Sequence, residues 1–472
     1  VSERRAPPRD GAPVGVAGAG VGGTIERRPM ATQLRMFEEQ RQPFYTQAKE
    51  RERIEKKFAP LIREELRLGQ IVSYMGNKDV PLLRLYRYKE AFAFHFVQEF
   101  IKRFELSSRD YLFDPFCGMG TTLFAAMQHQ ISAIGIDKLP VAVFVARTLP
   151  LFLTIEPQDL QRTFEELRSQ ARRAPLAAIA SDVAIMNVAF PDETLVTLRR
   201  WKSAIDALPP PMRDIFLLLF FAILEPCSYT AKDGQFLRLK RDKTVADPEE
   251  MLKKKVYEAQ KDIQAVRNLW AGEKLKFLPS VQMGDARDLT GVPFERPPTA
   301  IITSPPYANR YDYTRTYSLE LCFHFVKNFE ELKALRFGVL RSHIESKLGA
   351  HECPPHPVIE EVVSSLKERS KTLNNPKIPD MLTAYFVDMQ KVIREWARVL
   401  APHAQVALVV DNVRFEGELV PVDLVLSEMA EEAGFVVKQI LVARYKGNSS
   451  QQMGKFGRLP VRESVLLWQK EK

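Results

Sequence analysis

One stretch, residues 111–137, restricts the fold more than any other part of the chain. Its apolar start predicts a buried strand that ends at Asp114, and a glycine loop then leads into a helix predicted over 121–129. A second strand, predicted over 131–136, ends in Asp137, which follows Asp114 by 23 residues. Strand, glycine loop, helix, strand and acid make one βαβ half of a nucleotide-binding sheet. In such units an acid about 20 residues after the loop takes ribose hydroxyls.

The glycine loop differs from two well-known nucleotide loops. A P-loop would need Gly-Lys-Ser/Thr, which is absent from this stretch. A dinucleotide-binding fingerprint would place another glycine three residues after Gly120, where the chain has Leu123. An acid that opens the loop, Asp114, suits a ligand with an ammonium group better than a pyrophosphate. S-adenosylmethionine is such a ligand, and we expect it to be the cofactor.

A second feature, residues 303–307, reads TSPPY and follows the apolar run 300–302. This pattern predicts a buried strand that delivers a rigid turn. Two consecutive prolines remove two N–H donors, so the surrounding carbonyls stay free to accept hydrogen bonds. A hydroxyl and a tyrosine ring beside them suit a flat, amine-bearing base, which would stack on the ring. The alternative is an ordinary Pro-Pro turn with a core tyrosine.

Taken together, residues 114–122 (DPFCGMGTT) and 303–307 (TSPPY) resemble the motifs of the DNA amino-methyltransferase family. Members methylate the exocyclic amine of cytosine (N4) or adenine (N6). The resemblance covers residues 71–150 and 280–472. It implies an α/β fold with a Rossmann-like, mostly parallel sheet, S-adenosylmethionine as cofactor, and double-stranded DNA as partner.

The resemblance also implies a set of cofactor-binding residues. In the family the glycine loop cradles the cofactor, the acid after the second strand takes the ribose hydroxyls, and the acid after the next strand lies near the adenine. The segment before the loop helps to close over the methionine end. The expected cofactor-binding residues are Tyr88, Lys89, Asp114, Pro115, Phe116, Cys117, Gly118, Gly120, Thr121, Asp137, Asp285 and Ala286.

Catalysis is assigned by the same resemblance to the turn formed by Ser304, Pro305, Pro306 and Tyr307. Accepting the amine hydrogens on the Pro305 carbonyl and the Ser304 hydroxyl would push the nitrogen toward a tetrahedral lone pair. The sulfonium methyl would then be displaced directly, with no covalent enzyme intermediate, so we expect Cys117 to pack in the loop. The base must leave the duplex to reach the turn, and Tyr307 would stack on it.

Base specificity rests on the first residue of the tetrapeptide. Ser304 favours cytosine N4, with adenine N6 as the nearest alternative on the same fold and residues. An RNA base methyltransferase is disfavoured because no appended RNA-binding module is visible in the sequence. A catalytically silent DNA-binding scaffold is disfavoured because both motifs are intact.

The chain divides into four predicted regions. Residues 1–32 are a disordered tail rich in Arg, Pro, Gly and Ala, and Met30 could be the natural start. Residues 33–150 hold a long charged helix, ending near Arg67, and the cofactor-binding half. Residues 151–279 are a largely helical insert and the candidate target-recognition region. Residues 280–472 hold the catalytic turn and end in two strands that predict an antiparallel hairpin at one edge of the sheet.

The basic residues suggest where a polyanion would bind. Lys and Arg total 68 against 59 Asp and Glu, giving a net charge of +9, which suits DNA. Within the insert, basic residues cluster beside a predicted loop or hairpin turn near residue 230, and a solvated basic face is the alternative reading. The candidate DNA contacts are Lys232, Arg238, Lys240, Arg241 and Arg310.

Cysteine usage and hydropathy describe the setting. The four cysteines are widely spaced, with no CxxC or Cys/His pairing, which argues against a structural zinc and a disulfide framework and favours a reducing, cytoplasmic compartment. We predict no metal site. The longest apolar run, 215–224, is too short to span a membrane. A cognate restriction endonuclease is a further expected partner, and the sequence leaves monomer and homodimer open.

Overall fold

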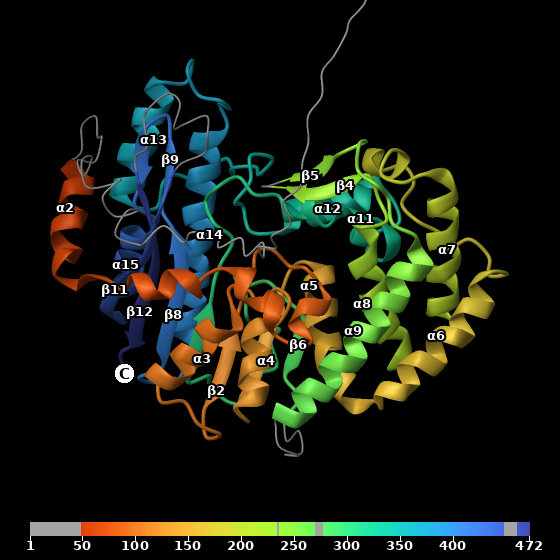
Figure 1. The fold of residues 1–472 in the computed structure, drawn as a ribbon. Helices are drawn as coiled ribbons and strands as arrows, with labels where there is room; N and C mark the ends of the chain where they lie inside the picture. Colours follow the sequence, from red (N-terminus) through yellow and green to blue (C-terminus); the bar gives the residue numbers. More distant parts are fainter. Residues whose placement is uncertain (1–48, 234–235, 270–276, 448–459) are drawn as a thin grey trace, which may run out of the picture. The chain divides into compact units, whose positions relative to one another are not determined.

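The computed structural model describes residues 49–233, 236–269, 277–447 and 460–472 (Figure 1). The predicted tail, residues 1–32, and the first part of the predicted N-terminal helix lie outside the described residues.

Eight of the described strands form one sheet in the order β1-β11-β12-β8-β7-β2-β3-β6. Strand β12 runs antiparallel to β11 and β8, and the other neighbouring pairs are parallel. The predicted Rossmann-like methyltransferase sheet is therefore confirmed. The strands are β1 (Ile62–Glu64), β2 (Tyr111–Asp114), β3 (Ser132–Asp137), β6 (Ser280–Met283), β7 (Ala300–Thr303), β8 (Gln405–Asp411), β11 (Phe435–Lys446) and β12 (Val461–Lys470).

The N-terminal segment corrects two predictions. Helix α2 (Lys49–Phe58) ends well before Arg67, because Pro60 stands in the turn that follows it. The chain then forms β1, which pairs in parallel with β11. The β11–β12 pair is antiparallel as predicted, but β1 and not this pair occupies the edge of the sheet.

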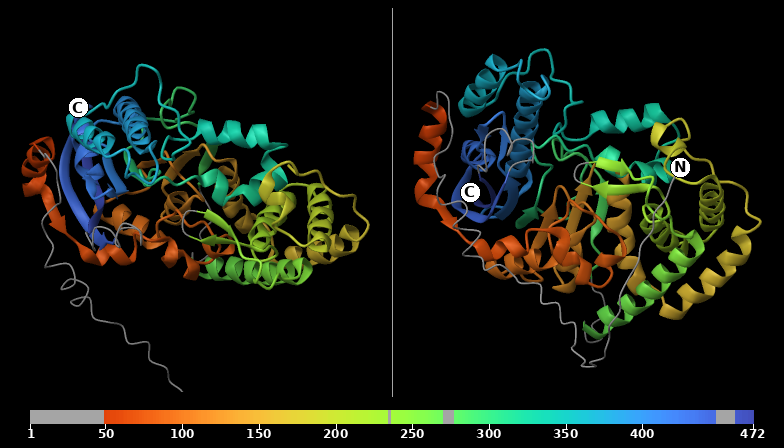
Figure 2. Two further views of the ribbon diagram at one scale, coloured as in Figure 1. Left: turned by 90° about the horizontal axis from the view of Figure 1, so that it is seen from above. Right: turned by 45° about the horizontal axis from the view of Figure 1, so that its top comes forward.

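Helices cover both faces of the sheet, whose strands alternate their side chains between two cores (Figure 2). Leu112 of β2 joins one core, and its neighbour Phe113 joins the other. The first core packs under α3 (Phe94–Arg103), α4 (Thr121–Gln128) and α5 (Pro140–Thr148). The second packs under α2, α13 (Pro357–Glu368), α14 (Ile378–Val399) and α15 (Val422–Glu432).

The insert is mainly helical, as predicted, and it extends the first core. The ring of Phe144 in α5 lies 5.5 Å from that of Phe221 in α8. One short antiparallel hairpin, β4 with β5, interrupts the helices at the predicted loop or hairpin turn. The elements are α6 (Pro157–Ala171), α7 (Asp192–Asp206), α8 (Met212–Leu224), β4 (Thr230–Asp233), β5 (Phe236–Leu239) and α9 (Pro248–Leu269).

Shorter elements complete the described chain. After residues 303–307 come α10 (Tyr313–Thr316), α11 (Ser318–Glu320), a π-helical turn (Leu321–Phe325) and α12 (Phe329–Gly338), and β9 (Val413–Phe415) pairs with β10 (Glu418–Val420). Single 3₁₀ turns lie at Ala59–Leu61, Leu66–Gln70, Tyr74–Asp79, Leu83–Leu85, Leu149–Thr154 and Ala184–Asn187. Within the described ranges no single helix has the length and apolar composition of a membrane span; only the sharply bent pair Pro140–Thr154 and Pro157–Ala171 meets both criteria jointly.

Candidate functional site

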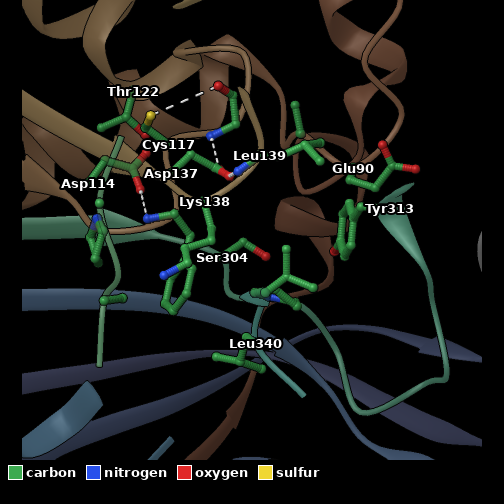
Figure 3. Close-up of a pocket in the computed structure, with 18 of the residues that line it drawn as sticks. Glu90, Asp114, Cys117, Thr122, Asp137, Lys138, Leu139, Ser304, Tyr313 and Leu340 are labelled. Carbon is green, nitrogen blue, oxygen red and sulfur yellow. Dashed lines mark hydrogen bonds between the residues drawn. The ribbon is translucent and has the colours of Figure 1, made fainter. Parts of the chain in front are cut away.

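A pocket holding about 840 Å³ of space, part of it open to solvent, lies at the carboxyl ends of β2, β3, β6 and β7 (Figure 3). The strand order reverses between β2 and β7, and open α/β sheets bind ligands at such a reversal. Ten of the predicted cofactor residues line the pocket: Tyr88, Asp114, Pro115, Phe116, Cys117, Gly118, Thr121, Asp137, Asp285 and Ala286.

The glycine loop is shaped by two left-handed residues. Gly118 has φ +50° and Gly120 has φ +86°, a region that side chains with a Cβ rarely adopt. A Cβ on Gly118 would lie 3.1 Å from the Tyr88 ring, and one on Gly120 would lie 2.9 Å from Cβ of Ala146. Gly120 therefore allows the chain to turn into α4, and it does not itself line the pocket.

Asp137 closes β3 and holds the loop. Its Oδ2 accepts a hydrogen bond from the Gly118 N–H at 3.0 Å, and its Oδ1 accepts one from the Leu139 N–H at 2.8 Å. Burial raises the pKa of Asp137, and the backbone donors oppose this shift. A carboxylate offers about four acceptor positions, so capacity remains for hydroxyl donors from a ligand.

Asp114 joins the loop to the predicted catalytic turn. Its Oδ1 accepts hydrogen bonds from the Thr303 hydroxyl at 2.6 Å and from the Phe116 N–H at 3.1 Å. The side chain is only 2% exposed, and burial raises its pKa to about 6. Because Thr303 directly precedes Ser304, one carboxyl group fixes both motifs relative to each other.

Asp285 lines the pocket in the company of two cations. Lys138 donates to it at 2.7 Å, and Arg287 donates through its guanidinium at 2.8 Å. Burial raises the pKa of Asp285, but the hydrogen bonds from Arg287 and Lys138 outweigh this and hold the pKa well below its ordinary value. Both cations line the pocket, and neither was predicted, since neither belongs to a recognisable motif.

Aromatic residues and one acid form the opposite wall. The Tyr88 ring stacks on that of Tyr317 at 4.9 Å, and burial raises the pKa of both phenols. Glu90 lines the pocket and accepts hydrogen bonds from the hydroxyls of Tyr311 and Tyr317. Tyr313 also lines it, beside Glu90 in Figure 3. Sequence reasoning missed Glu90 and Tyr313 as pocket residues, although Glu90 directly follows the predicted pair at 88 and 89.

Lys89 does not line the pocket. Its Nζ donates to the Lys232 carbonyl at 3.1 Å, which directs the side chain toward the β4–β5 hairpin. Its neighbours Tyr88 and Glu90 line the pocket, so a cofactor-binding role for Lys89 stays a prediction.

The predicted catalytic turn contributes Ser304 and Pro306 to the pocket, whereas Pro305 and Tyr307 lie outside its lining. The Ser304 hydroxyl has two acceptors within reach, the Val409 carbonyl at 3.3 Å and the Tyr307 hydroxyl at 3.4 Å. A hydrogen donated to either acceptor leaves the lone pairs of the Ser304 oxygen able to accept from an incoming group.

The predicted DNA contacts differ in how far they are exposed. Arg238, Lys240 and Arg241 are exposed. Lys232 is only 5% exposed and forms a buried ion pair with Glu320 at 2.6 Å, so its predicted phosphate contact would require this ion pair to open. Arg310 is half-buried, with its guanidinium 5.8 Å from the centre of the Phe415 ring.

The sheet order, the glycine loop and the acids at the strand ends define an S-adenosylmethionine-dependent methyltransferase. No protein-family model matches the chain. It is 32% identical to the type II methyltransferase M.BsoBI of Geobacillus stearothermophilus, over 89% of this chain and 92% of the relative. It is 33% identical to M.AvaI of Anabaena variabilis, over 89% and 93%. M.MvaI of Kocuria varians is 22% identical over 67% and 73%. The chain belongs to the type II methyltransferases.

The pocket fits S-adenosylmethionine by the chemistry of its lining. A loop with two left-handed glycines brings backbone N–H groups close, and an acid stands at the end of each of the strands β2 and β3, buried in the first and partly exposed in the second. The aromatic wall at Tyr88 supplies apolar surface. Cofactor pockets of several hundred cubic ångströms with a few convergent polar groups are of this kind.

Proposed function

We propose that this methyltransferase modifies the exocyclic N4 amine of cytosine in duplex DNA, at a base flipped out of the helix. The observation that carries the proposal is the state of Ser304, whose hydrogen is engaged and whose oxygen borders the cofactor pocket. A neutral acceptor at this position matches the family's preference for serine in N4 enzymes. The names of the relatives, type II methyltransferases, support DNA as the substrate.

The cofactor, when bound, supplies an electrophilic sulfonium methyl. We assign Asp137 to the ribose hydroxyls and Asp114 to the methionine ammonium. We assign Asp285 to the adenine end of the cofactor, where it holds the side chains of Lys138 and Arg287 in place. Gly118 lets the loop backbone approach closely.

The residues of the turn prepare the amine. The amine nitrogen of cytosine is a poor nucleophile because its lone pair is delocalised into the ring. The Ser304 oxygen and the Pro305 carbonyl accept its two hydrogens, which favours a tetrahedral nitrogen. The Tyr307 ring receives the flipped base by stacking. Positioning and hydrogen bonding supply most of the rate enhancement, and no cysteine nucleophile takes part; burial raises the pKa of Cys117 well above its ordinary value.

Nucleoside analysis of plasmid DNA from cells that express the protein tests this function. Mass spectrometry should find N4-methylcytosine in these cells and none in cells that express the Ser304→Ala/Tyr307→Ala variant. N6-methyladenine instead would keep the fold and overturn the base assignment. A protein that binds cofactor yet leaves DNA unmethylated would redirect the search to RNA or to a silent scaffold.

The setting of the reaction follows from the family. We infer that the protein acts in the cytoplasm of a prokaryote, where its four free cysteines stay reduced. A cognate restriction endonuclease stays a prediction from the resemblance, as do the recognition role of residues 151–279 and the monomer or homodimer alternatives.

A further inference from the structure

The β4–β5 hairpin of the insert has two chemically different faces. Residues directly opposite each other in an antiparallel pair share a face, and faces alternate along each strand. The register pairs Lys232 with Leu237 on one face, and Asp233 with Phe236 on the other. On the inner face, Lys232 is buried and Leu237 packs against the core.

The outer face carries an exposed aromatic ring and two cations. Phe236 is 47% exposed, and Arg238 and Lys240 follow it at intervals of two, with side chains 58% and 47% exposed. One acid, Asp233, shares this face, and its carboxylate lies 4.0 Å from Arg238 and 3.6 Å from Lys240. The face therefore keeps a net positive charge beside an apolar ring.

The inner face ties the hairpin to the wall of the cofactor pocket. Lys232 Nζ lies 2.6 Å from Glu320 and 4.2 Å from the centre of the Tyr317 ring. Tyr317 in turn donates to Glu90 of the pocket. Helix α10, which follows the catalytic turn, packs against β5. Figure 1 shows the hairpin and β9, which follows the carboxyl end of β8, at the same end of the molecule.

We propose that the outer face of the β4–β5 hairpin contacts duplex DNA beside the flipped base, with Phe236 against bases and Arg238 and Lys240 against phosphates. This inference rests on the proposed function and names the surface that function would use. Positive charge complements the phosphates. An exposed aromatic ring gains by leaving water when it contacts bases, and two-stranded ribbons fit a DNA groove.

Binding to short duplexes separates the two kinds of contact. The site is first located by sequencing the methylated DNA of expressing cells, and duplexes with the site and with a scrambled site are then compared. Arg238→Ala/Lys240→Ala should weaken binding to both and lower the slope of log K against log salt by about 2, one unit per phosphate contact. Phe236→Ala should weaken binding to the site duplex about tenfold and leave the slope unchanged.

Matched controls come from the end of the sheet at which its parallel strands begin. Phe277 is 38% exposed just before β6, and Lys102 and Arg109 are exposed near the start of β2. Phe277→Ala and Lys102→Ala/Arg109→Ala should bind like wild type. Thermal unfolding checks that the hairpin variants are folded. If wild type methylates DNA and these folded variants still bind DNA like wild type, the inference is overturned. If wild type leaves DNA unmethylated, the proposed function fails instead.

Discussion

The Tyr307 hydroxyl lies between two oxygens, 3.4 Å from the Ser304 hydroxyl and 3.4 Å from Oε1 of Glu463. Glu463 is 2% exposed and is itself held by Lys446 at 2.6 Å and by Arg444. Strand β12, which is separated by β8 from the strand that leads into the turn, thus helps to position the ring that would receive the base. This places the support of the catalytic turn outside both sequence motifs.

Tyr307 is predicted to act mainly through its ring. Tyr307→Phe keeps the stacking surface and loses only two long hydrogen bonds, so we expect a loss of less than about tenfold in kcat/KM for DNA. Tyr307→Ala removes the stacking surface and should lower kcat/KM for DNA about 100-fold. Steady-state kinetics on the same duplex compares them. Equal losses in the two variants would show that the hydroxyl, and not the ring, matters.

Asp137 is predicted to be the main polar anchor for the cofactor. Asp137→Ala removes an acceptor for charged or hydroxyl donors and should weaken S-adenosylmethionine binding by about 1–3 kcal/mol. Isothermal titration calorimetry measures this directly, and Asp242→Ala, at an exposed acid, serves as control. Unchanged affinity in Asp137→Ala would reject the ribose role.

Gly120 is predicted to tolerate no side chain. Gly120→Ala forces a positive φ on a residue with Cβ and brings that atom 2.9 Å from Cβ of Ala146, so we expect a loss of about 1–3 kcal/mol in the free energy of unfolding. Gly291→Ala is the matched control, because nothing lies within 4 Å of its Cβ position. Urea unfolding measures both. Equal stability of the two variants would show that the loop adjusts.

The features predicted from sequence are those with a local signature. The βαβ unit around Asp114 and Asp137 follows from hydrophobic period and a glycine loop, and the turn at Ser304 follows from two prolines after a buried strand. In these cases the backbone conformation is set by residues within a few positions of each other.

The features that were missed depend on distant partners. Glu463 reaches Tyr307 across 156 residues, and Lys232 reaches Glu320 across 88. A surface lysine and a buried one look alike in sequence, since burial is decided by which partner the fold supplies. Strand β1 was missed for the same reason, because its charged residues form a strand only by backbone pairing with β11.

Asp114 predicts a pH-dependent stability. Burial raises its pKa from an ordinary 3.8 to about 6, so the folded state favours the protonated form. The stabilising contribution is complete below about pH 4 and is lost as pH rises through about 6. Asp114→Asn does not titrate, so its stability relative to wild type should increase by roughly 1–3 kcal/mol over this window.

Urea unfolding at several pH values between about 3 and 7 tests the sign. Asp288 supplies a control of opposite direction, because hydrogen bonds from Thr290 lower its pKa. The stability of Asp288→Asn relative to wild type should decrease, not increase, as pH rises through the range in which Asp288 ionises. A flat difference for Asp114→Asn would mean that Asp114 is ionised throughout.

Lys232 is predicted to stabilise the fold and to make no phosphate contact. Lys232→Met leaves Glu320 buried without its cation and should cost about 3–5 kcal/mol of unfolding free energy. Lys232→Met/Glu320→Gln removes the stranded charge and should recover much of this loss. Because Lys232 lies on the inner face of the hairpin, the double variant should keep the wild-type slope of log K against log salt for DNA. A slope reduced by about 1 would instead restore Lys232 as a phosphate contact and require the hairpin to open on binding.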